Sequence, residues 1–106
     1  MRVILDECLP RRLTLELVGH TVTTVPKAGW AGKINGELLA LIEGRYDAFV
    51  TVDRNLSAQN NVAGSSFGVV VLRARSNKLG DLKPLVPQIL IVLSALKPGQ
   101  VSLVEK

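Results

Sequence analysis

Two short segments, RVILDE (residues 2–7) and AFVTVD (residues 48–53), decide the fold of this chain. Each is an apolar run of strand length that ends in one or two acids. Such runs are typical of strands buried on both faces of a parallel sheet. Since the carboxyl ends of parallel strands meet at one edge of the sheet, we expect Asp6, Glu7 and Asp53 to lie near one another there.

Three more apolar or β-branched runs predict further strands, at residues 21–25, 67–72 and 101–104. Apolar residues at helical spacing predict three helices. The first opens at Pro10 and ends at Gly19, the second begins at Asn35 and stops at Gly44, and the third runs from Asp81 or Leu82 to Lys97, while residues 55–64 form a polar turn or short helix. Since strand and helix alternate, we expect a single α/β domain over residues 1–106, with a mainly parallel sheet and helices on both faces.

The composition suits one small domain of a reducing compartment. The chain has 106 residues, of which 47% are apolar, enough for one packed core. Its single cysteine, Cys8, excludes an internal disulfide, and Cys8 with His20 alone cannot form a zinc site. The first apolar run is too short for a signal peptide or a membrane span, so we expect a cytoplasmic protein without a membrane segment. The net charge of +4 favours phosphate-bearing partners, although an ordinary basic surface explains it equally well.

The acids at the strand ends predict a metal site. Clustered carboxylates repel one another unless a cation or proton intervenes, and their hard oxygen atoms suit Mg²⁺ or Mn²⁺. We expect Asp6, Glu7 and Asp53 to bind such an ion, with Glu37 as a further acid and Asn35 as a neutral oxygen donor to metal or substrate. Simpler roles stay open for most of them: a helix cap (Asp53, Asn35), a partner of a helix dipole (Glu37) or a solvated acid (Glu7).

Basic and amide side chains surround the predicted acids. Arg54 and Asn55 follow Asp53 directly, and Arg73 opens a basic loop after the fourth strand. A guanidinium group can donate two hydrogen bonds to a phosphate, so these residues are candidates for substrate binding. A metal that activates water inside a positive rim suits the hydrolysis of an RNA phosphodiester. A solvated basic face is the simpler explanation for any one cation. The rest of the predicted rim consists of Arg11, Arg12, Arg75 and Lys78.

Two other residues are assigned structural roles. Cys8 is expected to be a small buried hydrophobic residue rather than a nucleophile. Trp30, in a loop with glycines on both sides, is expected to pack that loop against the core or to form a dimer contact, and stacking on a base is the alternative.

Several longer stretches resemble a known family, the small PIN-like domains of the VapC toxin-nuclease type. The similar segments are ILDECLPRRL (4–13), GHTVTTV (19–25), GWAGKINGELLALIEGRYDAFVTVDRNL (29–56) and VVVLRARSN (69–77). The resemblance implies a Rossmann-like, three-layer α/β/α sandwich and a Mg²⁺- or Mn²⁺-dependent endoribonuclease. It also implies a toxin–antitoxin pair with a cognate antitoxin protein, and a homodimer. By position, it makes Asp6 and Asp53 the catalytic acids, Glu7 their companion and Glu37 the helix-borne acid.

The chain departs from this family at two places. Many relatives begin the second helix with Asp, where this chain has Asn35. PIN nucleases also carry an acid beyond the fourth strand, where residues 73–77 contain none and Asp81 is the only acid nearby. These departures favour one metal ion over two, and they leave open a catalytically silent module that binds a partner without metal.

A signalling domain is a further alternative. Phosphoreceiver domains also carry an acid pair after the first strand and an acid after the third, which Asp6, Glu7 and Asp53 satisfy. They need a Ser or Thr at the end of the fourth strand, where this chain has Arg73, and a Lys at the end of a buried fifth strand. The missing hydroxyl and the basic loops favour a polynucleotide ligand instead.

Overall fold

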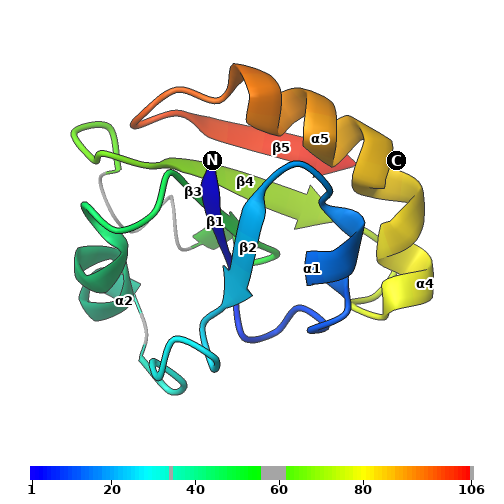
Figure 1. Cartoon of the computed structure of the whole chain (residues 1–106), viewed down its shortest axis with the longest axis horizontal. Coiled ribbons are helices and arrows are strands. Elements are labelled where there is room, and N and C mark those ends of the chain that lie inside the picture. The colour runs from blue at the N-terminus through cyan, green and yellow to red at the C-terminus, as the bar shows by residue number, and fades with distance from the viewer. Residues whose placement is uncertain (34, 56–61, 106) are drawn as a thin grey trace.

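The computed structural model describes residues 1–33, 35–55 and 62–105. Within these residues, five strands form one sheet in the order β2-β1-β3-β4-β5, and every neighbouring pair is parallel (Figure 1). The strands are β1 (Arg2–Leu5), β2 (Thr21–Thr24), β3 (Ala48–Thr51), β4 (Gly68–Arg73) and β5 (Val101–Glu105). The α/β class, the parallel sheet and the positions of the predicted strands are confirmed, with boundaries that differ by at most one residue.

Burial explains why the three central strands are almost entirely apolar. Every residue of β3 is buried, as are all of β1 except Arg2 and all of β4 except Arg73. The outer strands β2 and β5 have mixed burial, and their sequences contain both apolar and polar residues. Strands that bury both faces carry continuous aliphatic runs, whereas edge strands meet solvent on one side.

The strand order fixes where a ligand is expected. From β1 the chain first goes to β2 on one side, and then returns past β1 to form β3 on the other side. In open parallel sheets, ligands bind beyond the carboxyl ends of the strands at the point where the order reverses. In this chain that point lies between the ends of β1 and β3, which carry Asp6 and Asp53.

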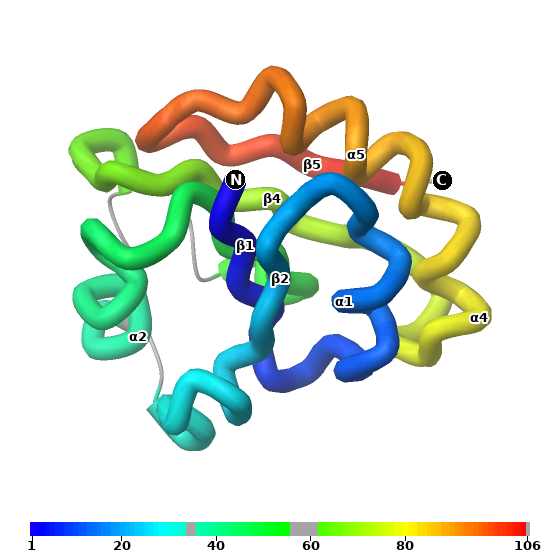
Figure 2. Tube along the Cα trace, in the orientation of Figure 1, coloured from blue at the N-terminus to red at the C-terminus, as the bar shows by residue number. Residues whose placement is uncertain are grey.

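Two apolar clusters pack against the two faces of the sheet. Along β1, Val3 and Leu5 belong to one cluster and Ile4 to the other, as the alternation of side chains in a strand requires. The cluster with Val3 includes residues of α1, α4 and α5, and the cluster with Ile4 includes residues of α2 (Figures 1 and 2). The helices are α1 (Leu13–Glu16), α2 (Asn35–Ile42), α4 (Leu79–Leu82), the 3₁₀ helix η1 (Lys83–Leu85) and α5 (Val86–Ala95).

The first helix is much shorter than predicted. The prediction runs from Pro10 to Gly19, whereas α1 covers only Leu13–Glu16. Before it the chain makes tight turns, in which the amides of residues 13–15 donate to carbonyls three residues earlier. Arg12 at the cap position makes no side-chain hydrogen bond to the helix, so no cap stabilises a longer one. Gly19, with φ of 85°, reverses the chain toward β2 and does not cap the helix directly.

The final helix begins earlier than predicted and is divided into three parts. It starts at Leu79 rather than at Asp81 or Leu82, and α4, η1 and α5 follow one another without a break in the chain. Pro84 lies in η1 and Pro87 in the first turn of α5. Because proline has no amide hydrogen and crowds the preceding turn, a regular α-helix cannot run through these positions unchanged.

The long loop after β2 is tied to the core by Trp30. Its ring packs against the cluster on the α2 side and meets the Tyr46 ring edge-on, with centroids 5.9 Å apart. The Arg45 guanidinium lies 5.9 Å from the Trp30 ring centroid. The predicted packing role of Trp30 is therefore confirmed. In the part of the chain that the structure describes, no helix is long and apolar enough to cross a membrane.

Candidate functional site

A buried hydroxyl joins the acids at the ends of β1 and β3. Thr51 is fully buried at the last position of β3, and its Oγ1 donates to Oδ2 of Asp6 over 2.6 Å. The same oxygen accepts the amide hydrogen of Asp53 over 3.1 Å. The Asp6 amide donates to the Val50 carbonyl, which fixes the end of β1 against β3. The Asp6 carboxylate and the backbone amide of Asp53, far apart in sequence, are thus bound to one side chain at the reversal point of the sheet.

Asp6 keeps capacity for a further ligand. Its Oδ1 accepts the amide of Glu7 over 2.8 Å, and its Oδ2 accepts the Thr51 hydroxyl. An ionised carboxylate has about four lone-pair sites, so two donors do not saturate it. The side chain is half-buried, which favours partners that stabilise its negative charge.

The side chain of Asp53 caps a helix. Its Oδ1 accepts the Asn55 amide over 2.9 Å, which is the geometry of a residue capping the helical residues that begin at Arg54. The residue is exposed, so an ion in the solvent can reach it. The cap that the sequence offers as the simpler role is therefore confirmed, and metal binding at Asp53 stays a prediction.

The other predicted acids have partners of their own. Glu7 is exposed, and its Oε2 accepts the Gly32 amide over 3.3 Å, which links the end of β1 to the long loop. Glu37 in α2 forms an ion pair with Lys33 over 2.8 Å, and this contact raises the pKa of the Lys33 ammonium. The structure does not gather these two acids with Asp6 and Asp53 into one cluster. Within residues 1–33, 35–55 and 62–105, no group of three or more His, Cys, Asp or Glu side chains is placed to hold a metal.

The acid pair fits only one kind of metal site. Mg²⁺ keeps several waters and is often bound by one or two carboxylates together with substrate phosphates. Asp6 and Asp53 supply such a pair of hard oxygen donors, whereas a closed cage of protein ligands would need more of them than the described residues offer. A water-rich Mg²⁺ or Mn²⁺ site that substrate completes is the arrangement these residues can hold.

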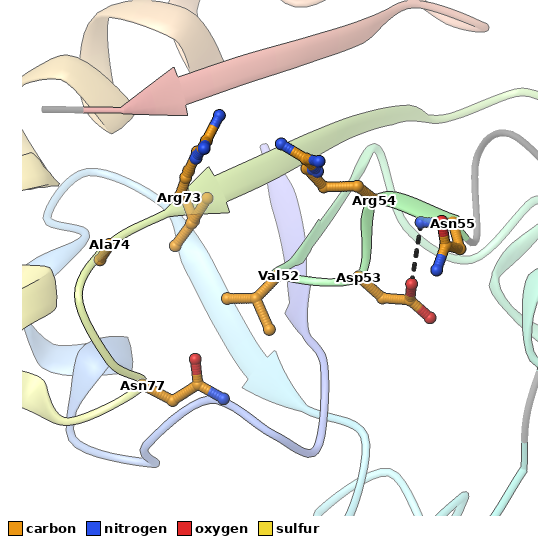
Figure 3. Close-up of a pocket in the computed structure, with 8 residues that line it drawn as sticks. Val52, Asp53, Arg54, Asn55, Arg73, Ala74 and Asn77 are labelled. Atoms are coloured by element: carbon orange, nitrogen blue, oxygen red, sulfur yellow. Dashed lines mark hydrogen bonds between the residues drawn. The ribbon is translucent and has the colours of Figure 1, made fainter.

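A pocket of about 470 Å³ opens beside Asp53, beyond the ends of β3 and β4. Figure 3 shows the side chains of Arg54 and Arg73 extending to the same side, away from the Asn77 amide, while the Asp53 carboxylate turns toward Asn55. The residues that line the pocket are Val52, Asp53, Arg54, Asn55, Leu72, Arg73, Ala74 and Asn77. Three predicted substrate-binding residues, Arg54, Asn55 and Arg73, thus share one pocket with Asp53.

Arg73 has a weak competing partner. Its Nη1 lies 3.7 Å from Oε2 of Glu105 on the neighbouring strand β5, and both side chains are largely exposed. Exposed ion pairs at this distance contribute at most about 1 kcal/mol. A phosphate that enters the pocket therefore competes for the Arg73 guanidinium at little cost.

Cys8 departs from its predicted role. The residue is exposed rather than buried. Partial burial of the thiol itself raises its pKa, and the negative charge of the nearby Asp6 raises it further. A thiol with a raised pKa is a poor nucleophile at neutral pH, so the prediction that Cys8 is not a nucleophile agrees with its surroundings.

The sequence analysis assigns no role to two residues of the site, Thr51 and Asn77. Thr51 lies in an apolar strand and opens the Thr-x-Asp-Arg-Asn segment of the family resemblance, and Asn77 lies in a basic loop. The available signal for Thr51 is its place two residues before Asp53, where a buried strand end needs a partner for its polar atom. For Asn35, which begins α2, the predicted role of its side chain lies outside what the structure describes, as do residues 56–61 of the predicted turn or helix.

Comparison with protein-family models, with curated proteins and with solved structures gives no match for this chain. Its function is therefore inferred from Asp6 and Asp53 at the strand ends, from the Thr51 hydroxyl that bonds to the Asp6 carboxylate and the Asp53 amide, and from the basic pocket beside Asp53.

Proposed function

We propose that this chain is a metal-dependent endoribonuclease in which Asp6 and Asp53 hold Mg²⁺ or Mn²⁺. The observation that carries the proposal is the Thr51 hydroxyl, which bonds to the Asp6 carboxylate and to the backbone amide of Asp53 at the reversal point of a parallel sheet. Both acids follow neighbouring central strands, and Mg²⁺ is often bound by one or two carboxylates together with substrate phosphates. Functional ligands of doubly wound sheets bind at the same place.

The residues divide the chemistry among them. A divalent ion bound there supplies a Lewis acid that makes water nucleophilic at neutral pH. Thr51 holds the Asp6 carboxylate in one orientation through its 2.6 Å hydrogen bond. Arg54 and Arg73 in the adjacent pocket supply fixed positive charge for the phosphate that carries the scissile bond. Glu37, paired with Lys33, requires a change of partner before it acts as a third acid.

The resemblance to PIN-like toxin nucleases extends this proposal. Apolar clusters on both faces of the sheet support a three-layer α/β/α sandwich of the PIN-like type. The resemblance also implies the remaining parts of the proposal, which are that the protein is a cytoplasmic toxin, that it binds a cognate antitoxin protein and that it forms a homodimer. These parts depend on the sequence segments alone.

RNA cleavage tests the proposal directly. The chain is incubated with a mixed RNA pool and Mg²⁺ or Mn²⁺, beside Asp6→Asn, Asp53→Asn and a matched control, Glu16→Gln. Glu16 is an acid of α1 whose partner is Lys83, so its loss leaves the acid pair intact. We expect cleavage by the wild type and the control, and a loss of about 100-fold or more in both Asp variants. Cleavage that survives in both Asp variants contradicts the proposal.

Metal binding gives a second, independent measurement. An ion that binds only the folded chain raises its melting temperature by mass action, so Mn²⁺ is expected to stabilise the wild type and Glu16→Gln but not Asp6→Asn. Equal melting curves with and without Mn²⁺ would favour the silent, partner-binding module instead.

One observation favours a second candidate, a phosphoreceiver domain. The strand order 2-1-3-4-5 is that of flavodoxin-like doubly wound folds, which include receivers. Against it, β4 ends in Arg73 rather than in a Ser or Thr, and the described residues of β5 include no lysine. Covalent labelling by a small phosphodonor, abolished in Asp53→Asn, would promote this candidate over the nuclease.

A further inference from the structure

A second basic hollow lies at the carboxyl end of β2, on the opposite side of the acids from the pocket of Figure 3. It measures about 470 Å³ and is lined by Leu9, Arg11, Thr24, Pro26 and Lys27. A smaller hollow of about 350 Å³ shares Arg11, Thr24 and Lys27 with it and adds Arg12 from the turn before α1. The two hollows therefore adjoin each other at these shared residues, and together they make up the depression beside β2.

The depression is positively charged and lacks an internal counter-charge. Its lining includes Arg11, Arg12 and Lys27 but no Asp or Glu. The ion pairs formed among the described residues involve other cations, namely Arg2, Lys33, Arg73 and Lys83. Three cations that converge on a lining without a carboxylate form a site of positive potential, which attracts anions.

The strand order places this depression, the two acids and the Arg73 pocket one after another along the carboxyl edge of the sheet. Along the carboxyl edge the strands follow one another as β2, β1, β3 and β4. The edge therefore carries Arg11 and Lys27 beyond β2, Asp6 beyond β1, Asp53 beyond β3 and the Arg73 pocket beyond β4. At about 4.8 Å between strands, the two basic regions lie roughly 14 Å apart, with the acid pair between them.

We propose that the depression lined by Arg11 and Lys27 is a second phosphate-binding subsite, so that single-stranded RNA lies along the carboxyl edge with phosphates on both sides of Asp6 and Asp53. The proposal rests on the proposed ribonuclease function and adds the path of the substrate. Binding on both sides of the acid pair places an internal phosphodiester there, which is what an endonuclease needs and an enzyme that trims chain ends does not.

The chemistry of the depression favours a polynucleotide. A single strand repeats its negative charge at every nucleotide, so one chain can meet two basic regions with a gap between them. Pro26 is exposed and adds an apolar surface beside the cations, which the flat face of a base can cover. An acidic peptide is the rival ligand, and the experiment distinguishes the two.

Binding without metal tests this subsite apart from cleavage. A fluorescein-labelled oligouridylate of about eight nucleotides is titrated in EDTA with the wild type, with Arg11→Gln/Lys27→Gln, and with the control Arg2→Gln/Lys97→Gln. The control removes the same two charges from the opposite edge, where Arg2 begins β1 and Lys97 lies between α5 and β5. Circular dichroism establishes that all three proteins are folded.

We expect the Arg11/Lys27 variant to bind about tenfold more weakly at low salt than the control. The slope of log K against log[salt] should fall by about 0.7 for each phosphate that the variant no longer neutralises. Equal affinity of the two double variants, or no binding by the wild type, overturns the subsite. Displacement of the oligonucleotide by a polyglutamate peptide at equal charge concentration also overturns it, in favour of an acidic protein partner. Because EDTA removes the metal, a chain without nuclease activity still gives a clear result.

Discussion

Thr51 shows how one residue can organise a site without reacting. It is fully buried, and its hydroxyl is both the donor to Asp6 and the acceptor for the Asp53 amide. Removing the hydroxyl while keeping the shape of the side chain leaves Asp6 with one fewer donor and the Asp53 amide without its acceptor. Thr51 is therefore a positioning residue, whose effect passes through the two acids.

Thr51→Val is expected to lower stability and metal affinity together. Loss of the two hydrogen bonds should reduce the free energy of unfolding by about 1–2 kcal/mol, measured by urea denaturation. Misoriented carboxylates should weaken Mn²⁺ binding by about tenfold, measured by the Mn²⁺-dependent rise in melting temperature. Thr51→Ser keeps the hydroxyl and serves as the control, so it should retain most of the affinity. Full Mn²⁺ binding by Thr51→Val would contradict the positioning role.

Asp47 gives a prediction about pH. Its carboxylate accepts the Arg2 amide over 2.8 Å and forms an ion pair with the Arg2 side chain, and these contacts lower its pKa. A carboxylate with a lowered pKa stabilises the fold above its unfolded pKa of about 3.9, and loses this effect as the pH falls through the folded value.

Asp47→Asn should therefore be less stable than the wild type at pH 7, by less than about 1 kcal/mol because the side chain is 40% exposed. The difference should shrink to nothing as the pH falls below the lowered pKa. Urea denaturation of both proteins between neutral and strongly acidic pH measures it. A difference that stays constant over this range would show that the charge of Asp47 has no part in stability.

At the scale of single residues, the sequence predicts where the charged side chains lie better than it predicts which hydrogen bonds they form. Acids that follow buried strands have to lie at the sheet edge, so Asp6 and Asp53 are placed by topology alone. The pairing of Glu37 with Lys33 spans four residues, a spacing at which opposite charges often pair at a helix. The bond from Gly32 to Glu7 joins residues 25 apart, so it depends on how the loop after β2 folds and has no local pattern in the sequence.

Among the elements, the turn between α5 and β5 depends on one glycine. Gly99 has φ of 79°, and a Cβ added there would run into the backbone carbonyl of Ala63. Its amide donates to the Phe67 carbonyl over 2.9 Å, which sets where β5 begins beside β4. Gly19 has a similar φ of 85°, but a Cβ there would meet nothing within 4 Å. Comparing substitutions at the two glycines therefore distinguishes the cost of a positive φ from the cost of a steric overlap.

Gly99→Ala should cost clearly more stability than Gly19→Ala. Strain at positive φ alone should cost Gly19→Ala about 1–2 kcal/mol. Overlap with a backbone atom that cannot rotate away should add about 1–3 kcal/mol in Gly99→Ala. Thermal or urea unfolding of both variants measures the difference. Equal costs would mean that the chain around Ala63 yields without penalty.

Strands are more predictable than helices in this chain for a physical reason. A buried strand needs an apolar residue at nearly every position, and β1, β3 and β4 display that pattern openly. The length of a helix depends on its ends, and α1 has no side-chain cap to extend it. The prolines at 84 and 87 divide the final helix, although the spacing of its leucines looks continuous.

At the scale of the whole molecule, both faces of one sheet are packed at once. The residues of β3 alternate between the two apolar clusters, with Val50 facing α5 and Phe49 facing α2. A loss of packing on one face therefore destabilises strands that also pack against the other face. The alternation of apolar runs and helices predicts this architecture from sequence, whereas the strand order depends on which strands pair in space.

Ile89→Ala tests whether the two faces unfold as one unit. Ile89 is fully buried in α5, and its truncation should cost about 3 kcal/mol. Trp30, the single tryptophan, packs on the opposite face and reports on that side by fluorescence. Because the sheet is shared, the fluorescence and circular dichroism transitions should both move to lower urea by the same amount. A Trp30 transition that stays at its wild-type midpoint, while circular dichroism shifts, would mean that the α2 side holds together without the α5 side. In that case the acid pair between β1 and β3 would depend on the α2 side alone.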